Sequence, residues 1–538
     1  MLFSKAIDAA VPCDDQVALK PSLALKALVL NVLCGRDPLY RIQSWISELP
    51  LPLILGQEID VAHFNDTSLG RHLDRFYEAD MRTIFNSCCL QVVQTESVSV
   101  SRLHGDTTSR LVYGTYNFEG DEVGLLARGH SKDNRPDLKQ LMYGLVTSVD
   151  GVPVFGDVMP GNTSDKTWHG SVMPSLPKQA SRVHYVGDSA LATNANLCAA
   201  AANDIIITTR LPRTFAAHDA VIRRVIHEKI ALDVLGKVSD SGTASYSGCI
   251  IPNCKIVSDD GTEHVVQLGV YQSTEQNTRT ASTVDALLQR EMKRAQRAAK
   301  ALSSTSFACA KDAEDALQRF IDENSAATEA EQLFAISGKV VVREFVTPKR
   351  GRPAKNADLS SSSGYMVEID LLADSERIAA ALKQKNFFVL LHTGLATITA
   401  EELLRIYKGQ SVVETRFPFL KDPAMTEVFF VKSEHRVEVL GYIMLLSLLL
   451  WSVWERRVRR NLDASKEAPL RDTTGMKKSR PTAMVCRHIM SNIKVYRIQT
   501  NGVWSKWQIL GKLNHEQERV LRFSGPISQV KNKLLDTN

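Results

Sequence analysis

Apolar residues recur at helical spacing through residues 1–89. The segments 22–34 and 40–47 show this period, and a third covers 68–89. The third segment follows Asn65-Asp66-Thr67, a strong helix start signal. We therefore predict an N-terminal helical domain over 1–89, whose arginines include Arg41, Arg71, Arg75 and Arg82. Such a bundle could bind DNA, and it could equally serve as a scaffold or a dimerisation unit.

A β-pattern replaces the helical one after residue 90. Val, Thr and Ser alternate from Leu90 to Leu103, which is typical of a strand. Further strands are predicted at 109–118, 140–149, 183–186 and 205–209, and helices at 166–176 and 191–203. Several strands followed by strand–helix alternation predict a mixed α/β core, here over 90–215.

The pattern changes again between residues 216 and 385. Strands are predicted at 265–271 and 339–346, and between them lies a basic amphipathic helix at 285–302, with Arg290, Lys293, Arg294, Arg297 and Lys300. We interpret 216–385 as a β-rich insertion. The α/β pattern resumes over 386–460, where a strand at 387–391 precedes Thr399-x-x-Glu402, a capping box that opens a helix.

The segment Val439–Trp454 contains no charged residue, but it is shorter than the roughly 20 apolar residues of a spanning helix. We expect a buried core helix there and no membrane contact. The N-terminus has no signal-peptide core. The nine cysteines are odd in number and none forms a CxxC pair, which favours a reducing, cytoplasmic compartment.

The net charge of +5 is distributed unevenly. Residues 455–538 contain 18 Lys and Arg against 7 Asp and Glu, so the preceding part is mildly acidic. The basic C-terminal region, 461–538, suggests contact with a polyanion. A solvated charged end explains the same count almost as well.

Two aspartates stand at the ends of predicted strands. Asp106 follows His104 and Gly105, and Asp188 follows an apolar strand and Gly187. In open α/β sheets, strand ends are where sites assemble, and carboxylate oxygens suit hard divalent cations. Each Asp could instead cap the turn that follows it. His104 could touch a metal, although a packing or supporting role is the simpler interpretation.

Glu414 lies in a helical stretch that begins near Thr399. At about 100° per residue, Tyr407, Gln410, Glu414 and Lys421 would project within about 60° of one another. One helix face would then carry a phenol, an amide, a carboxylate and an amine. Pro418 is expected to kink the helix, which leaves the direction of Lys421 open. A solvated helix surface is the alternative.

The spacing Tyr407-x2-Gln410-x3-Glu414-x6-Lys421 resembles the Y-x2-R-x3-E-x6-K signature of the hairpin-forming DDE transposases of bacterial insertion sequences. Three further stretches are similar to the same family: Gly129-His130-Ser131-Lys132-Asp133-x-Arg135-Pro136-Asp137-Leu138, Pro160-Gly161-Asn162-Thr163-Ser164-Asp165 and Phe64-Asn65-Asp66-x2-Leu69-Gly70-Arg71. The likeness spans roughly residues 20–455.

This resemblance implies an RNase H-like mixed-sheet core interrupted by the β-rich insertion. It implies that Asp106, Asp188 and Glu414 are catalytic and hold two Mg²⁺ ions, for which Mn²⁺ can substitute. The implied activity is cleavage at the ends of an insertion sequence, followed by strand transfer into target DNA. Tyr407, Gln410 and Lys421 would bind the DNA end, with double-stranded DNA as partner and a homodimer holding two ends.

Gln410 departs from the signature, because the family has an arginine there that holds a phosphate, and glutamine carries no charge. Lys408, Arg416 or Lys421 could compensate. Arg210, after a strand, is a further candidate DNA contact. Arg350 and Arg352 lie in Arg-Gly-Arg-Pro, which resembles an AT-hook that enters the minor groove, or is simply a basic linker. An RNase H-type nuclease without strand transfer and an inactive DNA-binding descendant are the alternative functions.

Overall fold

The computed structural model describes residues 4–14, 16–114, 124–129, 135–176, 182–238, 243–325, 332–346, 361–424, 429, 431, 433–501, 503–505 and 507–525. The chain forms two compact units. Unit 1 consists of 1–210, 257–264 and 406–538, and unit 2 consists of 211–256 and 265–405. Helices and strands are mixed in both, so the predicted α/β class is confirmed at this level.

Unit 1 begins with helices only, as predicted for the N-terminal region. They are α1 (Ser4–Ala10), α2 (Pro21–Leu30) with a π-turn at Asn31–Gly35, α3 (Ile42–Ser47), α4 (Leu51–Leu55), α5 (Asp66–Glu78) and α6 (Met81–Thr95), with short 3-10 turns at Leu39–Arg41 and Val61–Phe64. The start signal at Asn65 is confirmed, since its side chain accepts a hydrogen bond from Ser68 N. The single helix expected over 68–89 is two helices, because Asp80 adopts a left-handed conformation with φ of 57°.

The strand predicted from Leu90 to Leu103 is wrong in its first half. Helix α6 continues to Thr95 and buries Cys88, Cys89 and Val92 in the same core as Ile84. These positions follow helical spacing, and tertiary burial outweighs the local β-propensity of the valines. The first strand is β1 (Arg102–Leu111), which starts later and ends earlier than the two predicted strands.

The sheet of unit 1 has the strand order β3-β2-β1-β4-β5. Its strands are β1, β2 (Gln140–Ser148), β3 (Pro153–Pro160), β4 (His184–Val186) and β5 (Ile206–Arg210). β1, β4 and β5 are parallel, whereas β2 pairs antiparallel with both of its neighbours. Helices α7 (Asp165–Val172) and α8 (Asn194–Ala202) and the 3-10 turns Met173–Ser175 and Ser189–Leu191 connect these strands.

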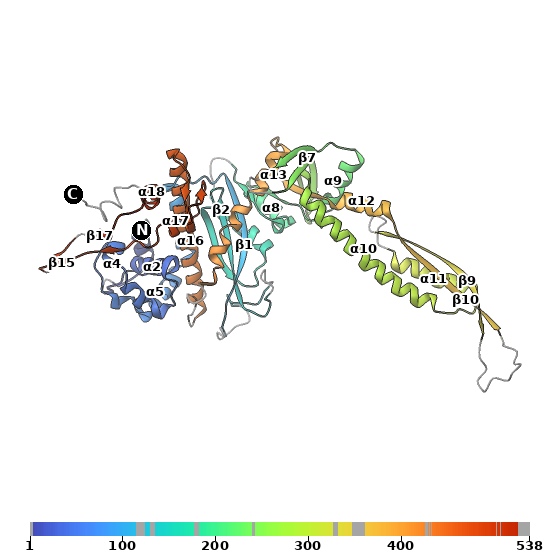
Figure 1. Cartoon of the computed structure of the whole chain (residues 1–538), viewed down its shortest axis with the longest axis horizontal. Helices are drawn as coiled ribbons and strands as arrows, with labels where there is room; N and C mark the ends of the chain where they lie inside the picture. The colour runs from blue at the N-terminus through green and yellow to red at the C-terminus, as the bar shows by residue number, and fades with distance from the viewer. Residues whose placement is uncertain are drawn as a thin grey trace, which may run out of the picture. The chain divides into compact units, whose positions relative to one another are not determined.

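Helix α16 (Glu434–Ser465) is the central helix of unit 1. By length and composition it could cross a membrane, but 78% of its most apolar window is buried within the protein. It packs against α2, α5, α6 and β3 (Figure 1). The prediction of a buried core helix is therefore confirmed. All nine cysteines are free thiols.

The rest of unit 1 consists of short elements. They are α14 (Ser411–Glu414), α15 (Phe417–Leu420), α17 (Ala483–Ile489), α18 (His515–Ser524), β12 (Leu470–Arg471), β13 (Lys477–Lys478), β14 (Val495–Tyr496), β15 (Gln499–Thr500), β16 (Val503–Trp504) and β17 (Gln508–Ile509). Helix α18 packs on α16 and begins with a full capping box at Asn514. These contacts attach the C-terminal region to the core helix.

Unit 2 combines sheet strands with a long helix-and-hairpin arm. Its elements are α9 (Ala216–His227), β6 (Asp233–Lys237), β7 (Ser245–Val257), β8 (Glu263–Ser273), α10 (Thr274–Ser303), α11 (Ala310–Asn324), β9 (Phe334–Val346), β10 (Ser361–Ala373), α12 (Ser375–Lys385), β11 (Phe387–His392) and α13 (Ala400–Lys408). The order β11-β8-β7-β6 forms its sheet, and α10 and α11 lie along the β9–β10 hairpin (Figure 1). Helix α10 is much longer than the basic helix predicted at 285–302.

Candidate active site

Asp106 lies inside β1 and not at a strand end as predicted, whereas Asp188 follows the end of the neighbouring strand β4. β1 and β4 are parallel, and their register pairs Leu103 with Tyr185 and His104 with Val186. Two residues further along, this register brings Asp106 level with Asp188. Because paired strands lie about 4.8 Å apart, both carboxylates belong to one small region at the end of β4.

Each aspartate also has a local role. Asp106 Oδ1 accepts a hydrogen bond of 2.7 Å from the backbone of Thr107. Asp188 Oδ1 accepts one of 3.0 Å from Ala190 N and so caps the 3-10 turn after β4. Asp188 therefore caps the turn that follows it, as the alternative interpretation predicts. It does not remove the carboxylate from solvent, since 46% of the side chain is exposed.

Glu414 belongs to a broken helix. The stretch from Thr399 to Lys421, in which we expected a kink at Pro418, forms α13, α14 and α15, with turns at 409–410 and 415–416. The predicted capping at Thr399 is present, since its hydroxyl accepts from Glu402 N at 3.2 Å. Pro418 lies in the first turn of α15, where its missing N–H costs nothing. The break expected near Pro418 is present at 415–416, and a second break at 409–410 means that the four residues do not lie on one continuous helix.

Tyr407 shows that the predicted residues nevertheless converge. Burial raises the pKa of its phenol, and the nearby Arg210 guanidinium opposes this effect. The charges of Asp188, Glu414 and Asp106 raise the pKa further. Three carboxylates and one arginine from separate parts of unit 1 thus act on a single hydroxyl. Glu414 and Arg210 are both exposed.

Gln410 is placed as a buried link to β1. Its Nε2 donates a hydrogen bond of 2.7 Å to the carbonyl of Gly105, next to Asp106. The adjacent Gly409 lies against the His104 ring, which is buried, and burial lowers the His104 pKa to about 4. His104 is therefore neutral at physiological pH and packs under the site. A DNA contact by Gln410 stays a prediction.

Arg416 does not replace the missing arginine of the signature. Its side chain is buried, and its NH2 group contacts Glu455 Oε1 on α16 at 2.9 Å. Glu455 also pairs with Arg459 and accepts a hydrogen bond from Ala483 N. Arg416 thus connects the segment after Glu414 to the core helix, and its buried guanidinium is not accessible to a phosphate.

Lys421 is held in place by Arg110. The buried Arg110 guanidinium donates to the carbonyls of Leu420 and Asp422, on either side of Lys421, and lies over the Phe429 ring at 5.0 Å. Arg110, Lys421, Tyr113 and Arg135 line one cavity of 290 Å³. Ser109, Leu111 and Pro423 complete the lining, and Arg135 is already paired with Asp137 at 2.7 Å, so Lys421 is the cation of this cavity that a phosphate could meet.

Several supporting residues are visible only in the structure. Tyr185 lies across Gly105, where a Cβ would come within 1.9 Å of its hydroxyl. That hydroxyl hydrogen-bonds to His169 Nδ1 at 2.9 Å, and His169 Nε2 is 3.7 Å from Asp188. Burial, with the charges of Asp106 and Asp188, raises the pKa of Tyr185 far above its usual value. Alternation marked Tyr185 as a strand residue, but no local pattern indicates these contacts.

One motif of the family resemblance has a clear position. Asp165, the last residue of the Pro160–Asp165 stretch, opens α7 and accepts a hydrogen bond from the Thr107 hydroxyl at 2.5 Å. The motif therefore fixes β1 immediately beside Asp106. Residues 130–134 of the other motif lie outside the described residues, as do Arg350 and Arg352.

Oxygen ligands of the kind that Mg²⁺ prefers gather around Tyr407. Within the described part of the chain, no three His, Cys, Asp or Glu side chains form a ready-made ligand group for a metal ion. The carboxylate oxygens of Asp106, Asp188 and Glu414 are donors that fit a hard cation. Asp106 and Asp188 come from the neighbouring β1 and β4 segments.

The comparisons with known proteins concern the N-terminal helices alone. Residues 1–90 match the model of DUF4277, a domain of unknown function. The match covers α1 to most of α6 and ends before β1, so it includes none of the predicted site residues. No curated protein matches the chain.

Proposed function

We propose that this chain is a DNA transposase that cleaves insertion-sequence ends and transfers them into target DNA, with Asp106, Asp188 and Glu414 as its catalytic carboxylates. The arrangement that carries the proposal is the parallel pairing of β1 with β4, which brings the Asp106 and Asp188 segments side by side, together with Tyr407, whose pKa is affected by the charges of all three carboxylates and Arg210. Asp106 and Glu414 are 308 positions apart in the sequence, so no local sequence pattern explains why both affect the same hydroxyl.

The sheet of unit 1 supports the same proposal. A five-stranded order β3-β2-β1-β4-β5 with only β2 antiparallel is compatible with the RNase H-like core that the family resemblance implies. Unit 2 follows β5 in the chain and ends before Tyr407, at the position expected for an insertion between the second Asp and the Glu. A cytoplasmic location and a homodimer that holds two DNA ends belong to this proposal.

The roles of the residues follow from their positions. Asp106, Asp188 and Glu414 would hold two Mg²⁺ ions, which supply activation of a water and stabilisation of the leaving oxygen in phosphodiester chemistry. Tyr407 would donate a hydrogen bond to a phosphate, since its raised pKa keeps the phenol protonated. Lys421, held by Arg110, would add a positive charge near the DNA end.

The test uses labelled duplexes that contain the DNA flanking the gene for this chain, incubated with Mg²⁺ or Mn²⁺. We expect wild type to give hairpin or strand-transfer products, and Asp188→Asn and Asp106→Asn to bind the same DNA without cutting it. Asp204→Asn is the matched control, because Asp204 lies in the same unit with a left-handed φ of 57° that asparagine tolerates.

Each other result has a definite meaning. Normal cleavage by Asp188→Asn would exclude the assigned site. Nicks without hairpins or strand transfer would favour a nuclease of RNase H type. Binding without any cleavage by wild type would favour an inactive descendant of a transposase.

A further inference from the structure

Helix α10 carries a line of cations on the side that faces solvent. Arg290, Lys293, Arg297 and Lys300 are all exposed and follow one another at spacings of three, four and three residues. At about 100° per residue they project within about 80° of one another, and they extend about 15 Å along the axis. We call these four residues the α10 stripe.

The opposite side of α10 is its packing face. Val284 is buried in a cluster with Leu333 and Ala381, and Ala295 and Ala299 are buried further along the helix. This face contacts β10, α12 and α11. The stripe is therefore the side of α10 that packing within unit 2 leaves uncovered.

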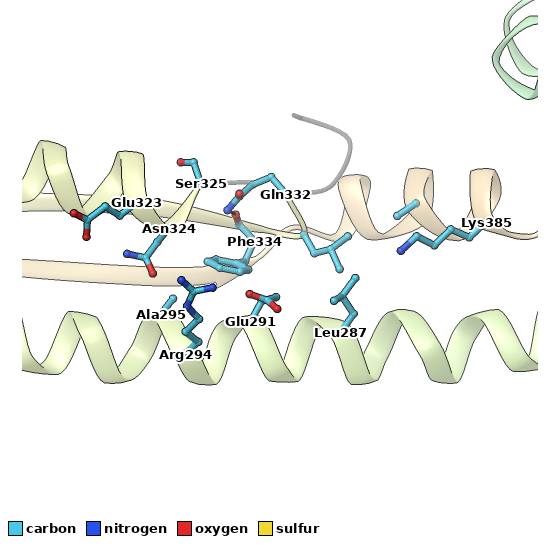
Figure 2. A pocket seen from close by; sticks show the side chains of 12 residues that line it. Leu287, Glu291, Arg294, Ala295, Glu323, Asn324, Ser325, Gln332, Phe334 and Lys385 are labelled. Atoms are coloured by element: carbon cyan, nitrogen blue, oxygen red, sulfur yellow. Dashed lines mark hydrogen bonds between the residues drawn. The ribbon is translucent and has the colours of Figure 1, made fainter. Parts of the chain in front are cut away.

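Arg294, the remaining cation between residues 286 and 303, has a different direction. Arg294 lines a cavity of 360 Å³ together with Glu291, Glu323 and Phe334. Figure 2 shows Arg294 and Glu291 extending from α10 toward Phe334 on β9. The cavity has both acidic and basic side chains, so its lining indicates no particular ligand, and Arg294 is not part of the stripe.

The stripe is free of compensating acids along most of its length. In the part of the chain that the structure describes, Lys293, Arg297 and Lys300 take part in no ion pair. Arg290 contacts its neighbour Glu291 at 2.9 Å, with 75% of the arginine side chain exposed. Between residues 286 and 303 Glu291 is the only acidic residue in the sequence, and it faces the cavity.

Helix α11 provides the contrast within unit 2. It contains two basic residues, Lys311 and Arg319, against five acidic ones: Asp312, Glu314, Asp315, Asp322 and Glu323. A helix face that only contacts solvent needs charged side chains, but these can be positive or negative. A single sign along three turns of α10 favours a partner of the opposite sign with a repeating charge.

We propose that the α10 stripe docks on the phosphate backbone of duplex DNA. A duplex presents one negative charge per about 1.7 Å of its axis, so a 15 Å line of cations can meet several phosphates. Contacts of this kind orient a protein on DNA without reading its sequence. The choice of duplex DNA as the polyanion rests on the proposed function, whereas the exposed stripe does not.

The test compares two matched double variants. Lys293→Gln/Arg297→Gln removes one Lys and one Arg from the stripe, and Lys311→Gln/Arg319→Gln removes one Lys and one Arg from α11. Binding to a labelled 40-base-pair duplex of arbitrary sequence is measured from about 50 to 200 mM salt in EDTA, where metal-dependent cleavage is blocked. The size of the salt slope should fall by about 0.9 for each phosphate that the protein no longer neutralises.

We expect the stripe variant to show a slope smaller by close to two units and the α11 variant to keep the wild-type slope. Equal slopes for both variants would overturn the proposal, as would full retention of affinity by the stripe variant. Failure of the transposase proposal is seen separately, because it shows as absence of cleavage in Mg²⁺ while this binding difference persists. Circular dichroism of both variants should match wild type, since all four positions are exposed.

Discussion

Two regions of this protein are rich in arginine and lysine, and they use their charge in opposite ways. One is the C-terminal part of α16 with α18, in unit 1. The other is the α10 stripe, in unit 2. In the first region most of the arginines form ion pairs with acids of the same unit, whereas in the second three of the four cations form no ion pair with any residue that the structure describes.

Three arginines of α16 form ion pairs with carboxylates of unit 1. Arg456 contacts Asp150 at 3.0 Å, Arg457 contacts Glu96, and Arg459 contacts Glu455 at 2.8 Å. In α18, Arg519 and Arg522 both contact Glu467. These five of the 18 Lys and Arg that the sequence places after residue 454 are thus paired with acids of the same unit. The C-terminal excess of charge is a weaker indication of a polyanion than its count suggests.

A basic region is available to DNA only where the protein does not neutralise it. A cation that already pairs with a carboxylate of the protein attracts a phosphate weakly. The residues around a cation therefore decide whether it can bind DNA. On α10 the neighbours are set by helical periodicity, so the sequence alone predicts them. On α16, Arg456 and Arg457 have partners more than 300 positions away in the sequence, Asp150 and Glu96.

The largest expected effect is at Glu455. Glu455→Gln would leave the buried Arg416 and Arg459 without a counter-charge, and breaking such a pair costs about 3–5 kcal/mol. Urea unfolding should show this destabilisation, while the salt slope of DNA binding by the folded protein stays at the wild-type value. Glu58→Gln is the control, since Glu58 is 71% exposed in its pair with Arg497. A destabilisation below about 1 kcal/mol for Glu455→Gln would show that the pair is not needed.

A smaller and pH-dependent destabilisation is expected at Arg457. Its hydrogen bonds hold the pKa of Glu96 below the usual value, so they favour the ionised carboxylate. This stability is complete above the unfolded pKa of about 4.3 and is lost as the pH falls through the lower folded pKa. Arg457→Gln should cost about 2 kcal/mol at pH 7.

At a pH below the folded pKa of Glu96, the unfolding free energies of Arg457→Gln and wild type should converge. Arg457→Lys keeps the charge and should retain part of the stability. A constant difference across the whole pH range would contradict the role of Glu96. Chemical denaturation at a series of pH values measures both variants.

Single changes in the α10 stripe should alter DNA binding but not stability. Lys300→Gln is expected to reduce the salt slope by about 0.9 and to change the unfolding free energy by less than about 0.5 kcal/mol. Arg290→Gln should reduce the slope less, because Arg290 shares its charge with Glu291. The reverse order would indicate that the DNA contacts the N-terminal end of the stripe only.

The smallest expected effect is a gain. Glu291→Gln would release Arg290 from its exposed ion pair, which is worth at most about 1 kcal/mol. Duplex affinity at 0.1 M salt should therefore rise by less than about fivefold. Gln289→Glu, on a neighbouring position, should lower the affinity, and an increase there would contradict the electrostatic account.

Much of the secondary structure could be predicted, because it depends on residues that are close together in the sequence. The strands near 140–148, 184–186, 206–210 and 387–392 and the helix α16 were all indicated by periodicity. The misses have tertiary causes: α6 continues through a β-rich sequence because its valine and cysteines are buried, and the helix around Glu414 breaks where Gly409 packs on His104. Among the longer strands, β3, β6, β7 and β10 were not predicted.

The sequence by itself determined the chemical types in the candidate site and the one-sided charge of α10, because both depend on residue identity and local spacing. Only the tertiary structure decided which charged side chains pair within the protein and which stay exposed. It set Asp106 level with Asp188 through the β1–β4 register and buried Gln410 against Gly105. It also paired Arg416 with Glu455. Such contacts join residues far apart in the chain, and no local pattern encodes which distant partner a side chain will meet.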